Sequence, residues 1–353
     1  MSPFSLHHLL LNMLVSFRLY VSLSLFGVLC LSFLNRNIEK KLFSLSGKAQ
    51  GTTFIIHYYA EQEMFQIADI YQILNTVDSS LSQYKSYSLI SRFNQSPVGV
   101  KTDKHLKSMI RSSLYFSTLT NGDFDITVKP ISSLWGFNGK QRSKPPSKRH
   151  IKSVLSLVGS NHILLKGDSL VKLNPGVMID VDGIAQGYTV DLLADYLTGL
   201  GINSFLVELG GEIVTSGAKP DGSAWSVGVE GPVEEEQLTS IIGKNLLVSG
   251  KAVTTSGNYR KFIKIRDEYF GHIIDPKTGR PSTNGVIAVT VIADDATTAD
   301  ALDNAFMVMG VEKTFELLKK MPEIGVYMVY RKTDGTITDT SNVLFERYIS
   351  TAF

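Results

Sequence analysis

The chain has almost no cysteine and no excess of either charge. Of its 353 residues only Cys30 is a cysteine, which excludes an intramolecular disulfide framework and a zinc site built from several thiolates. The 35 basic and 33 acidic side chains leave a net charge of +2, so no basic surface for nucleic acid is expected. Repeats and low-complexity tracts are also missing. With 43% hydrophobic and 19% charged residues, the sequence predicts an ordinary globular protein that binds no nucleic acid.

The longest apolar stretch lies near the N-terminus. Residues 9–34 are almost all apolar, and Arg18 is the interruption. Arg18 and the amino terminus suit the basic part of an export signal, residues 19–29 its short apolar part, and Cys30 the lipid-bearing first residue of a lipoprotein. Leu29 departs from that pattern, because a small residue is expected before the cysteine. An uncleaved anchor helix therefore stays open, as does a buried helix of the folded domain.

The same stretch determines the expected location and domain boundaries. A signal or an anchor places the rest of the chain on the periplasmic side of a bacterial inner membrane, held there through its N-terminus. Arg36, Lys40 and Lys41 weakly oppose this orientation, because basic flanks favour the cytoplasmic side. We expect residues 1–34 to be a signal peptide or membrane anchor, residues 35–47 a polar linker, and residues 48–353 one domain.

Apolar patterns beyond the linker predict a mixed series of strands and helices. Strands are expected at Thr52–Tyr59, Val177–Val181, Ser204–Leu209, Glu212–Ser216, Trp225–Glu230, Ala252–Thr255, Phe262–Arg266, His272–Ile274, Val286–Ala293 and Ile324–Tyr330. Helices are expected at Gln62–Leu81, Ser88–Asn94, Lys104–Leu119, Gly183–Leu197, Thr297–Met309 and Glu312–Lys320. Gly210 and Gly211 are expected to form a hairpin turn with positive φ. Strands predominate and helices are inserted singly, so the predicted fold class is α/β (α+β) in a single domain.

One predicted helix, within 296–310, carries polar residues on one face. Asp300, Asp303 and Asn304 are spaced i, i+3 and i+4, and the remaining face is apolar and should be buried. Several oxygen ligands near buried surface suit a hard cation such as Mg²⁺. The alternative, which this segment alone favours, is a solvated acidic face that begins at Asp294.

A second candidate is the turn within Ile179–Tyr188, where an expected strand ends in glycines and a helix begins. Free backbone N–H groups and the positive helix end at such a turn suit a phosphate group. Gly183 permits close approach of the backbone, and its carbonyl can ligate a metal. An ordinary glycine turn explains the pattern equally well.

Two further segments carry single polar residues of interest. His272 lies at the end of a short apolar strand, and it can take a proton from an attacking hydroxyl because its unperturbed pKa is near ~6.5. A histidine that is hydrogen-bonded into the following turn is the alternative. Asp125, within Gly122–Pro130, can accept hydrogen bonds from a heterocycle, whereas the nearby aromatic residues are more typical of core.

Taken together and in this order, these segments resemble the ApbE family of flavin transferases. The resemblance is carried by Gly51–Thr53, Leu81–Tyr84, Ile90–Asn94, Phe124–Pro130, Trp135–Phe137, Asp180–Asp191, Glu208–Glu212, Thr255–Tyr259, His272–Pro281 and Ala299–Gly310. These segments cover almost the whole chain beyond the linker. The resemblance implies a single α/β domain of the T-fold-like kind, with FAD bound in a deep cleft.

The resemblance also implies roles for particular residues. The Gly183 carbonyl, Asp300 and Asn304 match the family's magnesium ligands, and Asp303 is a further ligand or a neighbour of the ligands. His272 matches a histidine thought to assist catalysis. The residues that match FAD contacts are Gln50, Tyr84, Asp123, Phe124, Asp125, Gln186 and Ile273.

Three of these positions depart from the family pattern. Asn304 stands where the family usually has threonine, although an amide oxygen remains an acceptable ligand for a hard cation. Gln50 and Gln186 replace the usual methionine and lysine, which puts their individual contacts with FAD in doubt.

The activity implied by the resemblance is transfer of FMN from FAD to a threonine or serine of another protein, with release of AMP. Mg²⁺ would bridge the FAD diphosphate and neutralise its charge as the bond to AMP breaks. The acceptors implied are subunits of sodium-pumping quinone reductases or related electron-transfer complexes. Two alternatives remain: a magnesium-dependent FAD pyrophosphatase, in which water replaces the protein hydroxyl, and a non-catalytic flavin-binding protein.

Overall fold

The computed structural model describes residue 13 and residues 39–137, 143–230, 242–258, 262–265 and 268–350. The chain divides into two units, Met1–Lys41 and Leu42–Phe353, and the fold below is that of the second. Apart from Met13, the predicted signal or anchor segment 1–34 lies outside the described residues. Within the described ranges, no helix has the length and apolar character needed to cross a membrane.

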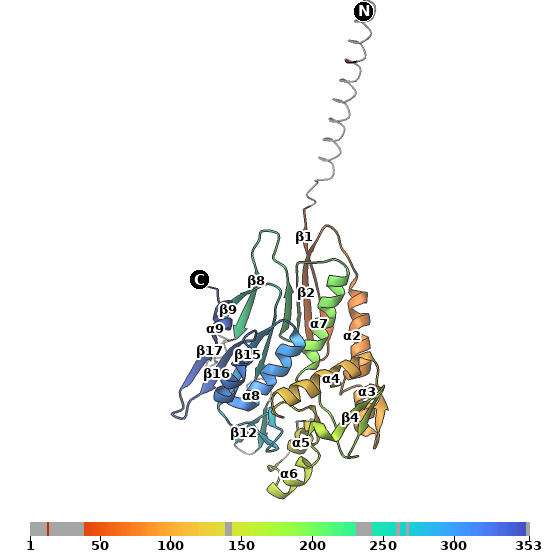
Figure 1. Cartoon of the computed structure of the whole chain (residues 1–353), viewed down its shortest axis with the longest axis vertical. Helices are drawn as coiled ribbons and strands as arrows, with labels where there is room; N and C mark the ends of the chain where they lie inside the picture. Colours follow the sequence, from red (N-terminus) through yellow and green to blue (C-terminus); the bar gives the residue numbers. More distant parts are fainter. Residues whose placement is uncertain are drawn as a thin grey trace, which may run out of the picture. The chain divides into compact units, whose positions relative to one another are not determined.

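An eight-stranded sheet runs through the domain (Figure 1). Its strands in spatial order are β1 (Lys41–Ala49), β2 (Thr52–Ala60), β6 (Phe205–Leu209), β7 (Glu212–Ser216), β10 (Ala252–Gly257), β15 (Val286–Ala293), β16 (Gly325–Arg331) and β17 (Ile337–Ser341). From β2 onward each neighbouring pair is antiparallel. Because β1 starts at Lys41, residues 41–47 of the predicted linker are in fact an edge strand. Its exposed and half-buried residues alternate, which is the period of two that a strand requires.

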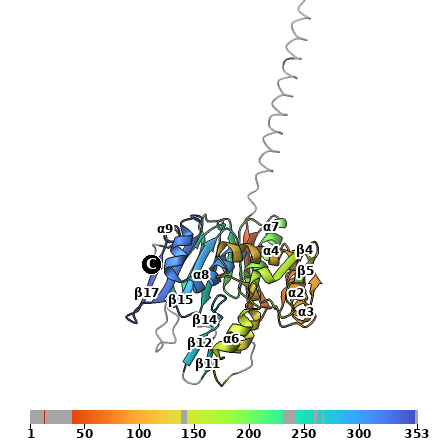
Figure 2. The same cartoon turned by 60° about the horizontal axis from the view of Figure 1, so that its bottom comes forward.

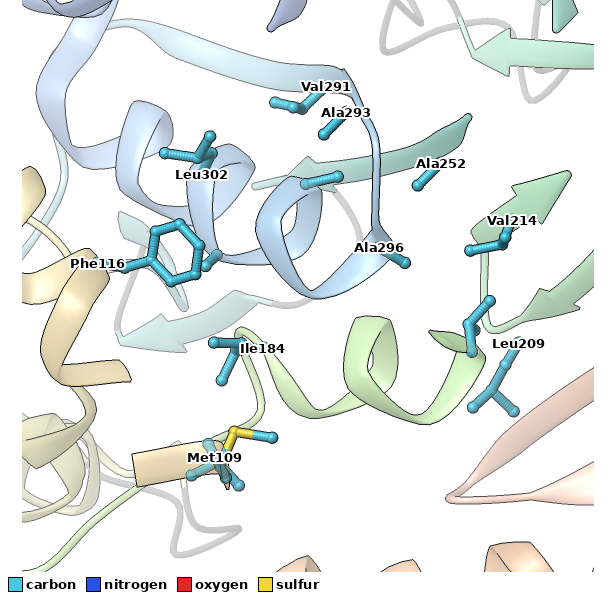
Figure 3. Close-up of a cluster of buried hydrophobic side chains, with 14 of the residues drawn as sticks. Met109, Phe116, Ile184, Leu209, Val214, Ala252, Val291, Ala293, Ala296 and Leu302 are labelled. Atoms are coloured by element: carbon cyan, nitrogen blue, oxygen red, sulfur yellow. The ribbon is translucent and has the colours of Figure 1, made fainter. Parts of the chain in front are cut away.

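Two helices pack directly against one face of this sheet. They are α7 (Ala185–Gly199), over β6 and β7, and α8 (Ala296–Leu318), over β10 and β15. Two more, α2 (Ile67–Leu81) and α4 (Lys104–Leu119), pack on α7 and α8 in turn. The apolar core between helices and sheet includes Leu302 of α8, Ile184 before α7, and Val291 of β15 (Figure 3).

The opposite face of the sheet is covered by a hairpin of β8 (Trp225–Glu230) and β9 (Ile242–Val248) together with α9 (Val343–Glu346). Burial on both faces explains why β15 reads as an almost unbroken apolar run. Its Val289 and Val291 belong to the helix-side core, whereas Ala288 and Ile292 belong to the hairpin-side core.

A third apolar cluster gathers short elements at one end of the domain, near α6 and β12 in Figures 1 and 2. They are α5 (Lys129–Trp135), α6 (Lys148–Leu155), β11 (Phe262–Ile265), β12 (Glu268–Gly271), β13 (Ile274–Asp275) and β14 (Arg280–Pro281). Trp135 is buried among them, and its Nε1 donates a hydrogen bond to the Gly279 carbonyl at 2.8 Å. The segment that carries His272 lies between β12 and β13.

The remaining elements are short. They are α3 (Leu89–Gln95), two 3₁₀ turns at Ile126–Val128 and Ser160–His162, and a small sheet of β3 (Gly99–Lys101), β5 (Ser169–Lys172) and β4 (Ile163–Lys166).

Most predicted elements are confirmed within a few residues. Gly210 and Gly211 form the β6–β7 turn with φ of 67° and 105°. The two helices predicted at the C-terminal end are continuous in α8 except at Gly310, whose φ of 77° breaks the helical path between them. The predicted strand Val177–Val181 is wrong, since it forms no ladder with another strand in the described part of the chain. Of the predicted strand His272–Ile274, only Ile274 is in a strand, where it pairs with Pro281 of β14.

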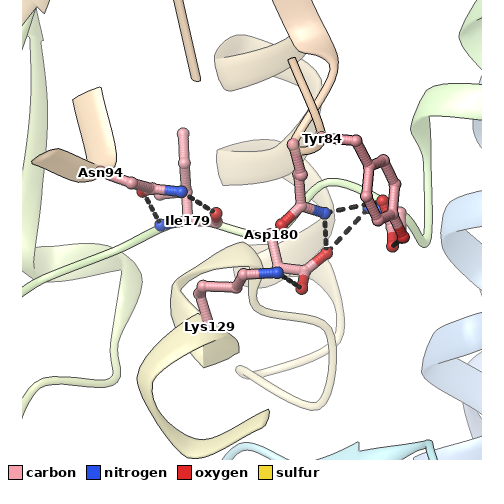
Figure 4. A network of polar contacts seen from close by, with 7 residues as sticks. Tyr84, Asn94, Lys129, Ile179 and Asp180 are labelled. Atoms are coloured by element: carbon pink, nitrogen blue, oxygen red, sulfur yellow. Dashed lines mark hydrogen bonds and ion pairs between the residues drawn. The ribbon is translucent and has the colours of Figure 1, made fainter. Parts of the chain in front are cut away.

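Buried and half-buried residues alternate along Val177–Val181, but its backbone forms hydrogen bonds outside any strand pair. Asn94 holds Ile179 from both sides: its Nδ2 donates to the Ile179 carbonyl at 2.9 Å, and its Oδ1 accepts from the Ile179 N–H at 2.7 Å (Figure 4). The Asp180 N–H donates to the Ile126 carbonyl at 2.6 Å. A side chain and a turn thus satisfy groups that a neighbouring strand would otherwise pair.

Candidate functional site

The crossing of α7 over α8 brings the two predicted halves of the metal site together. Gly187, in the first turn of α7, lies so close to α8 that a Cβ there would be 2.2 Å from the Ala296 carbonyl oxygen and 2.8 Å from the Asp300 Cβ. Its N–H donates to Asp300 Oδ2 at 2.9 Å. Only glycine permits this approach, and the approach sets Asp300 beside the turn that contains Gly183.

Four oxygen atoms from these elements converge on the side-chain amide of Asn304. Its Nδ2 lies 3.4 Å from the Gly183 carbonyl, 3.1 Å from the Asp300 carbonyl, 3.2 Å from Asp300 Oδ1 and 3.0 Å from Asp303 Oδ1. The amide rests against the Gly183 backbone, since a Cβ on that glycine would be 3.0 Å from Asn304 Cγ. We call these four oxygens the oxygen cluster.

Both carboxyl groups of the oxygen cluster are buried. Asp300 is 2% and Asp303 0% exposed, so the alternative of a solvated acidic face is wrong. Burial raises the pKa of Asp300 to about 7. Burial, and then the charge of Asp300, raise the pKa of Asp303 well above its ordinary range. Within the described ranges, neither carboxyl forms an ion pair with a basic side chain.

One oxygen of the Asp303 carboxyl group has no hydrogen-bond donor in the described part of the chain. Its Oδ1 accepts from the Ser256 hydroxyl of β10 at 2.9 Å and from Asn304. Its Oδ2 is buried and has no partner within hydrogen-bond geometry among the described residues, and the same holds for the hydroxyl of Thr254, which lies beside the Asp303 side chain. A buried carboxylate oxygen without a donor costs free energy unless a proton or a cation supplies the missing charge.

The chemistry of the oxygen cluster suits a hard divalent cation. Mg²⁺ prefers carboxylate, carbonyl and amide oxygens, and such oxygens surround the side chain of Asn304 within 3.4 Å of its Nδ2. The described part of the chain contains no group of three or more His, Cys, Asp or Glu side chains that could hold a metal ion. The oxygen cluster is not such a group, because only two of its residues are carboxylates and its other oxygens are backbone carbonyls.

A polar network flanks the cluster on the side of residue 182 (Figure 4). Lys129 Nζ lies 3.1 Å from Asp180 Oδ2, and the Gln83 amide donates to both Asp180 and Asp182. The Tyr84 hydroxyl donates to Asp182 Oδ2 at 3.4 Å. The negative charge of Asp182 is the main cause that raises the pKa of Tyr84 to about 12, although its side chain is 84% exposed. An exposed aromatic ring beside the Gly183 turn suits a flat ligand.

The Asp123–Asp125 run is engaged within the chain itself. Asp125 is 8% exposed, and its oxygens accept from the Thr127 N–H at 2.8 Å, the Thr127 hydroxyl at 2.5 Å and the Ser160 N–H at 2.7 Å. Asp123 forms an ion pair with Lys277 at 2.7 Å. Phe124 is buried. These contacts give Asp125 a structural role, and the predicted FAD contacts of the run stay predictions.

The two glutamines lie near the N-terminal half of α7. Gln50 adopts a φ of 50° in the β1–β2 turn, and its Nε2 donates to the Thr189 hydroxyl at 3.0 Å. Gln186 lies over the β6–β7 turn, where a Cβ on Gly210 would be 2.6 Å from its Nε2. Their predicted contacts with FAD also stay predictions.

The segment with His272 and Ile273 is tied to α8. The Ser282 N–H donates to the Ile273 carbonyl at 2.9 Å, and the Ser282 hydroxyl donates to the Met307 carbonyl, one turn beyond Asp303, at 3.3 Å. His272 is half-buried, and its predicted catalytic role stays a prediction.

A groove of about 480 Å³ lies elsewhere, between α4, α7 and the start of α8. Its lining includes Arg111, Tyr115, Asp191 and Asp195, and none of the predicted site residues. Asp191 is engaged there as a cap, because it accepts from the backbone N–H groups of Ala296 and Thr297. The chemistry of the oxygen cluster makes that cluster the stronger candidate.

Sequence reasoning assigned no role to Ser256, Gln83 or Lys129. All three stand inside segments that carried the family resemblance, but their contacts depend on tertiary structure. Tyr259, in the same segment as Ser256, lies outside the described residues.

The fold is that of a class of proteins, the flavin transferases. The structure resembles the flavin transferase ApbE from Vibrio cholerae with a TM-score of 0.78 and 32% identity, covering 88% of this chain and 99% of that one. It also resembles the apo flavinyl transferase ApbE of Pseudomonas stutzeri, with a TM-score of 0.79 and 31% identity over 90% and 99% of the two chains. A relative from Vibrio cholerae serotype O1, named FAD:protein FMN transferase, is 34% identical over 88% of this chain and 91% of its own length. Residues 50–328 match the model of the ApbE family, and the chain belongs to that family.

Proposed function

We propose that this chain transfers FMN from FAD to a threonine or serine side chain of another protein, with release of AMP, and that the reaction requires Mg²⁺. Relatives that share about a third of its residues over most of their length are named FAD:protein FMN transferases. The observation that carries the magnesium requirement is the oxygen cluster, in which two buried carboxyl groups lie together without a basic partner among the described side chains and Asp303 Oδ2 has no donor.

The residues that would hold the ion are Asp300, Asn304 and the Gly183 carbonyl, with Asp303 as a further ligand or a neighbour. Mg²⁺ bound there would neutralise charge on the FAD diphosphate as the bond to AMP breaks. The Gly187 N–H fixes one oxygen of Asp300, so its other oxygen faces the cluster in a set orientation. The exposed Tyr84 ring offers a surface for the flavin or the adenine.

The transfer step breaks the phosphoanhydride bond of FAD and forms a phosphoester with the acceptor. The acceptor hydroxyl oxygen bonds to the FMN-side phosphorus, the bond from that phosphorus to the AMP oxygen breaks, and AMP leaves with the electron pair. The hydroxyl proton passes to His272, the candidate base on the segment tied to α8. Holding the hydroxyl in line with the bond that breaks lowers the activation free energy by on the order of several kcal/mol through positioning alone.

We further propose a location and a class of acceptor. The apolar stretch before Cys30 would export the chain to the periplasmic side of the inner membrane, held by a lipid on Cys30 or by an anchor helix. Acceptors would be subunits of sodium-pumping quinone reductases or related electron-transfer complexes in that compartment. Mass analysis of the membrane-extracted protein tests the tether, because an intact N-terminus with unmodified Cys30 would contradict lipidation.

The activity is tested by incubating the purified chain with FAD, Mg²⁺ and an acceptor fragment. The expected result is an acceptor that gains the mass of FMN, AMP in equal amount, and no reaction in EDTA. Free FMN and AMP with an unmodified acceptor would show the alternative, an FAD pyrophosphatase. If FAD stays intact in the presence of Mg²⁺ and acceptor, the remaining alternative is a non-catalytic flavin-binding protein.

A further inference from the structure

The Asn304 amide donates hydrogen bonds within a cluster that holds more acceptors than it can serve. An NH₂ group has two hydrogens, whereas four oxygens lie within 3.4 Å of Nδ2. Two of these oxygens belong to the buried carboxyl groups of Asp300 and Asp303. The amide therefore supplies hydrogen-bond donors to a region that is otherwise rich in acceptor oxygens.

A metal ligand must present oxygen, not hydrogen, to the cation. The two ends of an asparagine amide have nearly the same shape, so a half turn about χ2 places Oδ1 where Nδ2 was. After that turn Oδ1 would face the Asp300, Asp303 and Gly183 oxygens at similar distances. That arrangement is repulsive by itself, and it becomes favourable when a divalent cation lies among the oxygens.

We propose that Asn304 serves the oxygen cluster in two orientations that exchange when the cation binds. With Nδ2 directed inward, as in the structure, it bridges the buried carboxyl groups of Asp300 and Asp303. With Oδ1 directed inward, it is a ligand of the cation, which takes over the neutralising role of the NH₂ group. This inference rests on the proposed metal site. It adds that the NH₂ group of Asn304 stabilises the folded chain when the cation is absent and is not needed for that when the cation is bound.

The test is thermal unfolding of the full chain in EDTA and in saturating Mg²⁺, with two variants at this position. Asn304→Asp has the same shape, lacks both donors and adds a third carboxylate, so its Tm in EDTA should be lower than that of the unmodified chain by roughly 5 °C or more. Mg²⁺ should close this gap, because carboxylate is a good ligand. Asn304→Thr keeps an oxygen and one donor, so it should show a smaller gap that Mg²⁺ also closes, and it serves where the aspartate variant fails to fold in EDTA.

Asn342→Asp is the matched control. Asn342 also donates through a half-buried amide, to the Ile324 carbonyl at 2.7 Å, but it is bonded to backbone groups and not to carboxylates. Its loss of Tm should be the same in EDTA and in Mg²⁺. The proposal is overturned if Mg²⁺ leaves the Tm difference between the position-304 variants and the unmodified chain unchanged. It is also overturned if the variants and the unmodified chain have equal Tm values in EDTA. Neither outcome contradicts FMN transfer. If Mg²⁺ does not change the Tm of the unmodified chain, the metal site itself fails, and this proposal fails with it.

Discussion

Two regions of the molecule bury carboxyl groups to a similar degree but supply them with donors very differently. Around Asp125, two N–H groups and one hydroxyl are directed at two oxygens, and all come from residues fixed in turns. Around Asp300 and Asp303, one N–H group, one hydroxyl and one amide serve four carboxyl oxygens, and Asp303 Oδ2 has no partner within hydrogen-bond geometry in the described ranges. Burial alone does not distinguish a structural carboxylate from a ligand. The balance of donors and acceptors does, and it favours the second region as the proposed metal site.

The largest effect expected from this contrast is on activity. Asp300→Ala removes a proposed ligand, so Mg²⁺-dependent FMN transfer should fall on the order of 10²-fold or more. Transfer is measured as the rate of FMN mass gain on an acceptor fragment over a range of Mg²⁺ concentrations. A turnover rate with an unchanged Mg²⁺ dependence would remove Asp300 from the site.

The second effect is a dependence of stability on pH that Mg²⁺ should abolish. The pKa of Asp300 is raised in the folded chain, so the folded state binds more protons than the unfolded state between about pH 4 and about pH 7. Stability in EDTA should therefore fall as pH rises through that window, by on the order of 3 kcal/mol. Urea unfolding from pH 4.5 to 8 measures it.

The raised pKa of Asp191, about 6, changes stability in the same direction, but that residue lies outside the oxygen cluster. Only the part of the pH dependence that Mg²⁺ removes is therefore assigned to the cluster. A pH profile that is identical with and without Mg²⁺ would contradict the contrast between the two regions.

The third effect concerns the region with ample donors. Asp125→Ala leaves the Thr127 and Ser160 N–H groups without their acceptor, and it should lower the free energy of unfolding by about 2 kcal/mol. Denaturant unfolding in EDTA and in Mg²⁺ should give the same loss. If the stability is unchanged and FAD affinity falls, Asp125 is a ligand contact as the family resemblance implies, and its structural role is wrong.

The smallest effect is expected for a buried carboxylate whose charge is neutralised by a lysine side chain of the same protein. Lys277→Ala removes the partner of buried Asp123, and because Lys277 is partly exposed the expected loss of stability is only about 1 kcal/mol. Lys277→Met, which keeps most of the apolar stem, serves as the control for lost packing. Equal stability of all three proteins would show that Asp123 needs no counter-charge.

The sequence allowed most of the fold and the centre of the site to be predicted, for reasons that are local. The i, i+3, i+4 spacing placed Asp300, Asp303 and Asn304 on one helix face, and the double glycine predicted the β6–β7 turn. The wrong strand prediction at Val177–Val181 has a physical cause. The apolar alternation indicates which residues are buried, but it does not indicate which group forms hydrogen bonds with their backbone. That partner is Asn94, more than eighty residues earlier, and no local pattern identifies it. The donor count around Asp303 depends in the same way on Ser256 and on tertiary structure.

The close crossing at Gly187 has a consequence for how the protein matures. Gly187 and Asp300 are 113 residues apart, and the hydrogen bond between them exists only after α8 has packed onto the sheet. A chain still being synthesised, or one cut before α8, therefore lacks every proposed ligand except the Gly183 carbonyl. If these residues hold the cation as proposed, the protein cannot begin to modify its partners before α8 is in place.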